Sequence, residues 1–316
     1  MTRALLITNP AAARTAARAV RAVVETLRGG GWSVEVRATT RSGDARRFAE
    51  DARQGGFDVV VCYGGDGTAM QVAAGLLGSD IPLGIVPGGT GNLLAGNLRL
   101  PRSPVAAARA MLAGRTMALD VGAVERADGV HYFAVACGTG FDAELMARTA
   151  PADKRRWKMG AYVVRAISLL PTLTSVPHRV TVDGRAHEVS AAMVLVANCG
   201  EIVPPWLRLH ADVVPDDGWL DVMAVRADGV LDSVGALWEV LRASARGAGG
   251  ADPRVWFARG RCLKVEVLEG APRPVQLDGE SAGETPFETQ VLPGVLRVLA
   301  DPAALRRAPM VARQPA

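Results

Sequence analysis

Lysine is scarce in this sequence, because only Lys154, Lys158 and Lys264 among its 36 basic residues are lysines. None of the three follows a glycine-rich loop, and the motif GxxxxGK(S/T) is absent, which excludes a P-loop NTPase. The net charge of +4 suits anionic small molecules or an acidic lipid surface. It is too small to indicate nucleic acid as a partner.

Cysteine and histidine are also few, with four of each. The cysteines form no CxxC pair and the histidines show no zinc-like spacing, so we expect neither a disulfide framework nor a zinc site. Long apolar runs are missing, since residues 159–170 and 191–197 fall far short of the roughly 20 residues of a transmembrane span. The N-terminal segment lacks the apolar core of a signal peptide, and we therefore expect a cytoplasmic protein without a transmembrane segment.

The order of apolar runs and turns predicts two domains. Residues 1–118 alternate strand-like and helix-like segments, which indicates a doubly wound parallel sheet with helices on both faces. Residues 119–297 show mainly short alternating strands, including a hairpin with a DG turn at 180–189, and they predict an antiparallel β-sandwich. We expect helical insertions near 152–170 and 230–246, and a C-terminal tail, 298–316, that packs back on the first domain.

Two glycine loops follow neighbouring predicted strands of the first domain. In open α/β sheets, ligands bind beyond the carboxyl ends of the strands. Glycine lets backbone N–H groups approach a phosphate closely, and each loop leads into a helix N-terminus that favours anions. A single glycine loop could be only a tight turn between a strand and a helix, but two at neighbouring strand ends favour a binding site. The residues predicted to contact a phosphate ligand are Gly64, Gly65, Asp66, Gly67 and Thr68 in the first loop and Gly88, Gly89, Thr90 and Asn92 in the second.

Asp66 is an acid in a loop built for anions. Two like unit charges about 4 Å apart near a protein surface repel by roughly 4 kcal/mol. Asp66 could hold Mg²⁺ on a triphosphate, which would turn the repulsion into attraction. Alternatively, it could accept the proton of an incoming hydroxyl group. Both roles predict phosphoryl transfer.

The segments GGDGT, at 64–68, and PGGTGNLLA, at 87–95, together resemble the diacylglycerol kinase catalytic domain of bacterial lipid kinases and sphingosine kinases. Asn9-Pro10, Thr40 ahead of 43–45, and LDGE at 277–280 extend the likeness over nearly the whole chain. The resemblance implies an ATP-dependent lipid kinase that uses ATP and Mg²⁺, with its active site in the interdomain cleft. It also implies that Asn9 and Thr40 belong to the nucleotide site.

The two acidic residues of the LDGE segment have two interpretations. From the residues alone, Asp278 and Glu280 belong to an exposed DG turn. The resemblance implies instead that they act in catalysis with Asp66, one of the pair being the general base for the lipid hydroxyl. Which of the two accepts the proton stays open.

A second acidic segment, VVPDDGWLDV at 213–222, is simply a loop between strands if its residues are considered alone. The resemblance implies a structural Mg²⁺ bound by Asp217 and by the carbonyl oxygens of Val214 and Trp219. Carboxylate, carbonyl and water oxygens are ligands that this ion accepts. The family often has an asparagine near the position of Val135, and its role is left unassigned here.

The lipid acceptor is the part that the sequence leaves open. The basic residues at 154–158, which include Trp157, precede an apolar segment; they could touch an anionic membrane or form the solvated end of an ordinary helix. We expect a lipid substrate at a membrane surface, with peripheral contact at the inner face. A homodimer is one option for the oligomeric state. The rival functions are a NAD kinase-like enzyme and a non-catalytic nucleotide- or lipid-binding protein.

Overall fold

The computed structural model describes residues 1–140, 173–203, 207–208, 213–229, 232–235, 238 and 253–301. Residue contacts divide the chain into two units. The first contains Met1–Leu119 together with residues 294–301, and the second contains Asp120–Pro293. Of the predicted elements, the insertion at 152–170 lies outside the described residues, as do the tail after residue 301 and most of the insertion at 230–246.

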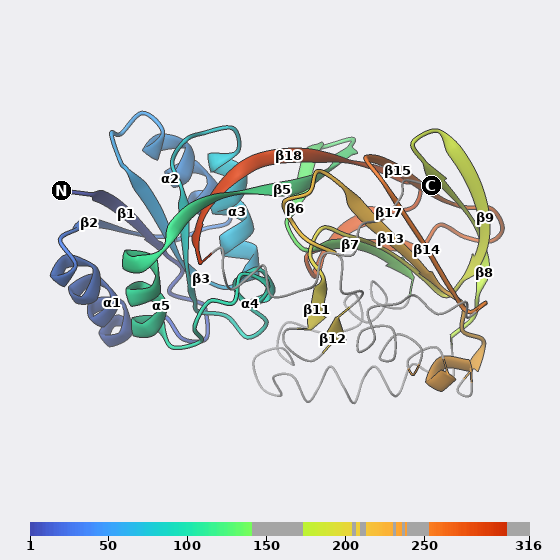
Figure 1. Ribbon diagram of the computed structural model, residues 1–316, viewed down its shortest axis with the longest axis horizontal. Helices are drawn as coiled ribbons and strands as arrows, with labels where there is room; N and C mark the ends of the chain where they lie inside the picture. The colour runs from blue at the N-terminus through green and yellow to red at the C-terminus, as the bar shows by residue number, and fades with distance from the viewer. Residues whose placement is uncertain are drawn as a thin grey trace. The chain divides into compact units, whose positions relative to one another are not determined.

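The first unit is a parallel sheet with helices on both faces. Its strand order is β2-β1-β3-β4, all parallel, and β18 pairs with β4 through Val298 and Leu83. Figure 1 shows α1 and α5 on one face and α2 and α3 on the other. The predicted doubly wound domain is confirmed. Its elements are β1 (Arg3–Thr8), α1 (Ala17–Gly29), β2 (Ser33–Ala38), α2 (Asp44–Ala52), β3 (Val59–Gly64), α3 (Asp66–Leu76), β4 (Leu83–Pro87), α4 (Leu93–Asn97) and α5 (Pro104–Ala113).

The burial of these strands follows from their place in the sheet. Every residue of β3 and β4 is buried, as expected for continuous apolar strands that helices cover on both faces. Strand β2 lies at the sheet edge, and most of its residues are exposed or half-buried. On α1, Val23, Val24 and Leu27 form the buried face and pack into the core of this unit.

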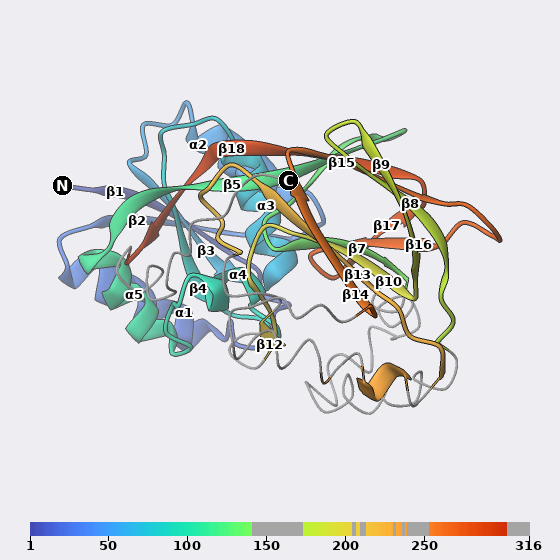
Figure 2. The ribbon, with the colours of Figure 1, turned by 45° about the vertical axis from the view of Figure 1, so that its right-hand side comes forward.

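The second unit is built from antiparallel strands, as predicted. One sheet has the order β14-β13-β10-β7-β16-β17, and Figure 2 shows β7, β10, β13 and β14 side by side. Strands β8, β9, β15 and the first part of β18 pair in a second sheet. Its elements are β5 (Arg115–Arg126), β6 (Gly129–Phe133), β7 (Ala136–Gly140), β8 (Val176–Val182), β9 (Arg185–Ala191), β10 (Met193–Ala197), β11 (Glu201–Val203), β12 (Leu207–Arg208), β13 (Leu220–Val225), β14 (Val255–Gly260), β15 (Cys262–Val267), β16 (Pro274–Leu277), β17 (Glu280–Glu284) and β18 (Phe287–Ala300).

The two sheets of this unit share one apolar core. Val180 and Leu263 from one sheet lie in the same buried cluster as Val194 and Val222 from the other. The predicted DG hairpin is also confirmed, because β8 and β9 pair around Asp183 and Gly184, whose φ angles are 46° and 85°. Positive φ at both central residues is what a two-residue hairpin turn requires.

None of the described helices is both long enough and apolar enough to cross a membrane.

Candidate functional site

The two glycine loops lie next to each other at the carboxyl ends of β3 and β4. Gly64 pairs with Pro87 at the end of the two strands, and the Gly88 N–H donates a hydrogen bond to the Gly64 carbonyl at 2.7 Å. A Cβ atom on Gly89 would lie only 2.6 Å from the Cα of Gly65. Only glycine allows the loops to approach this closely, since any side chain at this position would meet the backbone of the other loop.

Asp66 links the two loops. Its Oδ2 accepts the N–H of Asn92 at 2.7 Å, and its Oδ1 accepts the N–H of Leu93 at 2.5 Å. The pKa of Asp66 is raised, because the effect of burial outweighs that of the Leu93 and Asn92 N–H groups, which lower it. The backbone N–H groups at the start of α4 therefore donate to the carboxylate of Asp66, the acid whose place in an anion-binding loop had no explanation from the sequence.

Asn92 closes the second loop. It adopts the left-handed conformation, with φ of 52°. Its Oδ1 accepts the Gly89 N–H at 2.8 Å, and its Nδ2 donates to the Gly89 carbonyl at 2.9 Å. Thr90, between the two bonded residues, is exposed. The loop thus presents the Thr90 hydroxyl to solvent from a fixed backbone.

Asn9 joins the end of β1 to the first loop. Its Nδ2 donates to the Oγ1 of Thr68 at 3.1 Å, and its Oδ1 accepts the Ala11 N–H at 2.9 Å. Thr68 is buried on the first turn of α3, which also contains Gly67. The structure therefore brings Asn9 and both glycine loops into one cluster, in which Asn9 and Thr68 hold the backbone in place.

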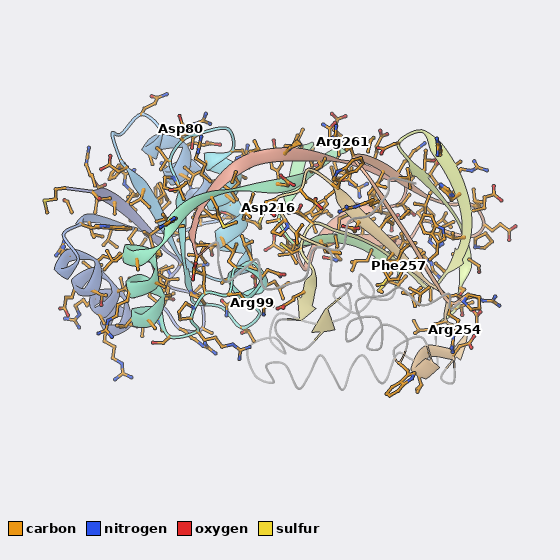
Figure 3. The ribbon with its side chains drawn as sticks, in the orientation of Figure 1. Asp80, Arg99, Asp216, Arg254, Phe257 and Arg261 are labelled. Carbon is orange, nitrogen blue, oxygen red and sulfur yellow. The ribbon has the colours of Figure 1, made fainter. Side chains whose placement is uncertain are left out.

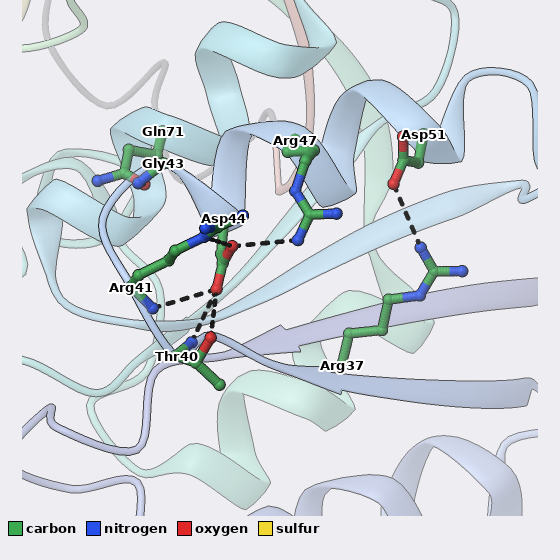
Figure 4. Close-up of polar contacts among 8 residues, drawn as sticks. All are labelled: Arg37, Thr40, Arg41, Gly43, Asp44, Arg47, Asp51 and Gln71. Carbon is green, nitrogen blue, oxygen red and sulfur yellow. Dashed lines mark hydrogen bonds and ion pairs between the residues drawn. The ribbon is translucent and has the colours of Figure 1, made fainter.

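Thr40 lies at a separate polar cluster around Asp44 (Figure 4). The N–H and the hydroxyl of Thr40 both donate to the Oδ2 of Asp44, each at 2.9 Å. Arg47 donates to Oδ1 at 3.1 Å. Asp44 is 3% exposed, and the Thr40 bonds hold the pKa of its carboxyl well below the ordinary value. Because the Thr40 hydroxyl donates its hydrogen bond to Asp44, its oxygen is left as an acceptor for a ligand.

The Asp278 turn occupies the end of the β16–β17 hairpin. Asp278 and Gly279 have φ angles of 48° and 85°. The Asp278 carboxylate accepts three backbone N–H groups: from Ala134 at 2.8 Å on Oδ2, and from Val135 and Ala136, each at 2.9 Å, on Oδ1. These bonds fix the carboxylate against the bend between β6 and β7 and stabilise its negative charge.

Glu280, two residues further on, is exposed. Its carboxylate makes no hydrogen bond or ion pair with any residue that the structure describes. The two acids of the LDGE segment therefore differ: Asp278 is held by backbone contacts, whereas Glu280 is exposed and has no partner among the described residues.

The loop predicted to bind a structural magnesium ion carries a different cation. The Oδ2 of Asp217 accepts a bond from Nη2 of Arg259 at 2.6 Å, and Oδ1 accepts the Trp219 N–H at 3.0 Å. Burial raises the pKa of Asp217, and Arg259 lowers it. The neighbouring Asp216, labelled in Figure 3, is exposed.

A magnesium ion on Asp217 and the carbonyls of Val214 and Trp219 would have to share the Asp217 carboxylate with two other partners. Each carboxylate oxygen accepts one described N–H, and the Arg259 guanidinium places a positive charge beside it. Among the described residues, no group of three or more His, Cys, Asp or Glu side chains is placed to hold a metal. The magnesium site stays a prediction, and no step below depends on it.

Sequence reasoning missed three contributors: Asp44, Gln276 and Asn198. Asp44 begins α2 directly after Gly43, whose φ of 85° marks the turn, so a GD pair before a helix was the available signal. Gln276 accepts the Gly279 N–H through Oε1 at 2.7 Å and so closes the Asp278 turn. Asn198 follows β10 and carried no signal, because its contacts come from distant parts of the chain. Lys154, Lys158 and Trp157 lie outside the described residues.

Comparisons with known proteins identify the family of this chain. The diacylglycerol kinase catalytic domain matches residues 3–124, and the YegS C-terminal NAD kinase beta sandwich-like domain matches residues 135–300. A protein of Pseudomonas fluorescens named "Probable lipid kinase YegS-like" is 31% identical over 88% of this chain and 89% of its own length. A diacylglycerol kinase of Mycobacterium tuberculosis is 30% identical over 93% of both chains.

Solved structures share the fold. A Bacillus anthracis chain described as "a putative diacylglycerol kinase" superposes with a TM-score of 0.78 at 24% identity, over 95% of this chain and 96% of its own. At that identity, the likeness supports the fold alone. The two domain matches and the full-length relatives establish more, and the chain belongs to the diacylglycerol kinase family of lipid kinases.

Proposed function

We propose that this lipid kinase transfers the γ-phosphoryl group of ATP to a hydroxyl group of a diacylglycerol-like lipid taken from a membrane surface. The observation that carries the proposal is the joining of the two glycine loops through Asp66, which accepts N–H groups of Asn92 and Leu93. Loops held this way present backbone donors and helix N-termini to a polyphosphate without having to rearrange. Membrane contact, a homodimer and a site in the interdomain cleft stay predictions.

The nucleotide would lie on the first unit. Gly64 to Thr68 and Gly88 to Asn92 would bind its phosphates, while Asn9 keeps the first loop in place through Thr68. Thr40 would contact the nucleotide through its hydroxyl oxygen, because the hydroxyl already donates a hydrogen bond to Asp44. Magnesium bound with ATP would neutralise charge on the transferring group. The Asp66 carboxylate accepts backbone N–H groups, including those of Asn92 and Leu93, and lone pairs that these bonds leave could bind that ion.

Glu280 is the better candidate for the general base. A base must reach the lipid hydroxyl and keep lone pairs for its proton, and positioned proton removal typically contributes about 10²–10⁴-fold in rate. Asp278 uses its oxygens to bind three N–H groups, whereas Glu280 is exposed without a described partner. We therefore assign proton acceptance to Glu280 and the placement of the turn to Asp278.

The test is a transfer assay with labelled ATP, Mg²⁺ and vesicles containing diacylglycerol, followed by identification of the product by mass. We expect a phosphorylated lipid, and we expect Glu280→Gln to lower kcat by about 10²-fold or more with little change in the KM for ATP. Glu269→Gln, another acid of the same unit, is the matched control and should keep its activity. Phosphorylation of NAD in place of every lipid tested would contradict the proposal.

A further inference from the structure

The bend at Ala134–Ala136 forms hydrogen bonds through both its N–H groups and its carbonyl groups. It connects β6 to β7 in the second unit. All three of its N–H groups donate to the carboxylate of Asp278, and the Ala136 carbonyl accepts the Asp278 N–H at 2.9 Å. The placement of the Asp278 turn thus depends on the exact path of three consecutive peptides.

The opposite side of the bend is held by Asn198 and Cys199. Their N–H groups donate to the Val135 carbonyl at 2.9 and 3.1 Å. The Asn198 side chain reaches further, because its Nδ2 donates to the carbonyls of Ala134 at 2.9 Å and Asp120 at 2.8 Å. Asn198 therefore ties the bend to the residue of β5 that begins the second unit.

The side chain of Asn198 buries one oxygen for which the described residues provide no hydrogen bond. It is 1% exposed, and its Oδ1 accepts no hydrogen bond from any described residue. The two carbonyl oxygens facing the amide determine which end is nitrogen. Buried polar atoms are nearly always paired, and an unpaired one calls for an explanation such as a functional role. The Asn198 amide binds two carbonyls at once, and the Cys199 thiol also donates to the Ala134 carbonyl, at 3.2 Å.

We propose that Asn198 is a positioning residue for phosphoryl transfer. By holding the Ala134 carbonyl, it sets the orientation of the peptides whose N–H groups bind Asp278, and through that turn the direction of Glu280. The inference rests on the proposed function, because it needs Glu280 to act on the acceptor. Asn198 itself touches no reacting atom. Misplacement of a catalytic group by about 1 Å can lower a rate by about 10²-fold.

The experiment compares Asn198→Ala with Thr139→Val. Thr139 is equally buried, lies on β7, and donates a single bond from its hydroxyl to the Pro274 carbonyl at 2.8 Å, so its loss weakens the same sheet without touching the bend. Both variants should unfold more easily. Only Asn198→Ala should lower kcat, by about 10-fold or more, with the KM for ATP unchanged. Only this variant should speed hydrogen–deuterium exchange of the amides of residues 134–136 in the otherwise folded protein.

Equal loss of kcat in the two variants, or unchanged exchange at residues 134–136 in Asn198→Ala, would overturn the inference. Should Asn198→Ala fail to fold, Asn198→Ser keeps one hydroxyl donor for the carbonyls and is read by the same two measurements. The exchange result needs no substrate. A wild-type protein that phosphorylates no lipid would therefore reject the proposed function, while the exchange data still decide whether Asn198 holds the bend.

Discussion

Asp66 explains how an acid can occupy a phosphate-binding loop. From the sequence alone, only a bound cation or a proton-transfer role made sense of it. In the structure, N–H groups of Asn92 and Leu93 meet the charge, so the acid also has a role in joining the loops before any ligand binds. That role could not be predicted, because it depends on the close contact of two loops that are separate in the sequence.

We predict that Asp66→Asn lowers the free energy of unfolding by about 1–3 kcal/mol, because an amide offers one acceptor and faces the other N–H with a donor. Urea denaturation would measure the change. Asp80→Asn is the matched control. The Asp80 side chain (labelled in Figure 3) is 94% exposed and forms a surface ion pair with Arg297. If the two variants had the same stability as the wild-type protein, the linking role of Asp66 would be wrong.

The stability of the protein should also depend on pH through His178. This side chain is fully buried, its Nδ1 donates to the Val176 carbonyl, and burial lowers its pKa below the ordinary 6.5. The folded state binds the proton less readily than the unfolded state, so its contribution is complete above pH 6.5 and is lost as the pH falls below that value. The free energy of unfolding should fall by more between pH 7.5 and pH 5.5 in the wild-type protein than in His178→Gln.

At the scale of elements, the apolar strands, the glycine loops and their order could be predicted from the sequence. β3 and β4 are continuous apolar runs, and the DG pair at 183–184 forms the predicted hairpin. The Asp278 turn was harder. Its DG pair predicted a hairpin end, but not that the carboxylate would bind the bend at Ala134–Ala136, which lies more than a hundred residues earlier. Short-range patterns carry no information on such long-range contacts.

The contact between the loops predicts that Gly89→Ala lowers stability and activity far more than Gly29→Ala does. Gly89→Ala places a Cβ atom 2.6 Å from the backbone of Gly65, which cannot move without displacing β3. Gly29→Ala meets nothing within 4 Å at the end of α1 and should be neutral or slightly stabilising, by about 0.5–1 kcal/mol. Thermal unfolding and the transfer assay would compare them, and full activity of Gly89→Ala would show that the loops do not need this approach.

At the scale of the whole molecule, the sequence was sufficient for the fold class and the family but not for the acceptor. The alternation of strands and helices, followed by short antiparallel strands, predicted both sheet types correctly. Acyl chains require only a generic apolar surface, so no pattern of residues specifies one lipid. The loop around Asp217 shows a second limit. The motif there implies a metal ion, which stays a prediction, and it gave no sign of the Arg259 contact, because that contact depends on the register of β13 with β14.

The most direct test of the account is calorimetric titration of the purified chain with ATP, in the presence of Mg²⁺ and again with EDTA. The central claim is that the joined glycine loops bind the phosphates of ATP together with its metal. We predict one ATP bound per chain with Mg²⁺, and an affinity about 10-fold or more weaker without it, because the cation offsets repulsion between the phosphates and Asp66. Absence of ATP binding in the presence of Mg²⁺ would contradict the account.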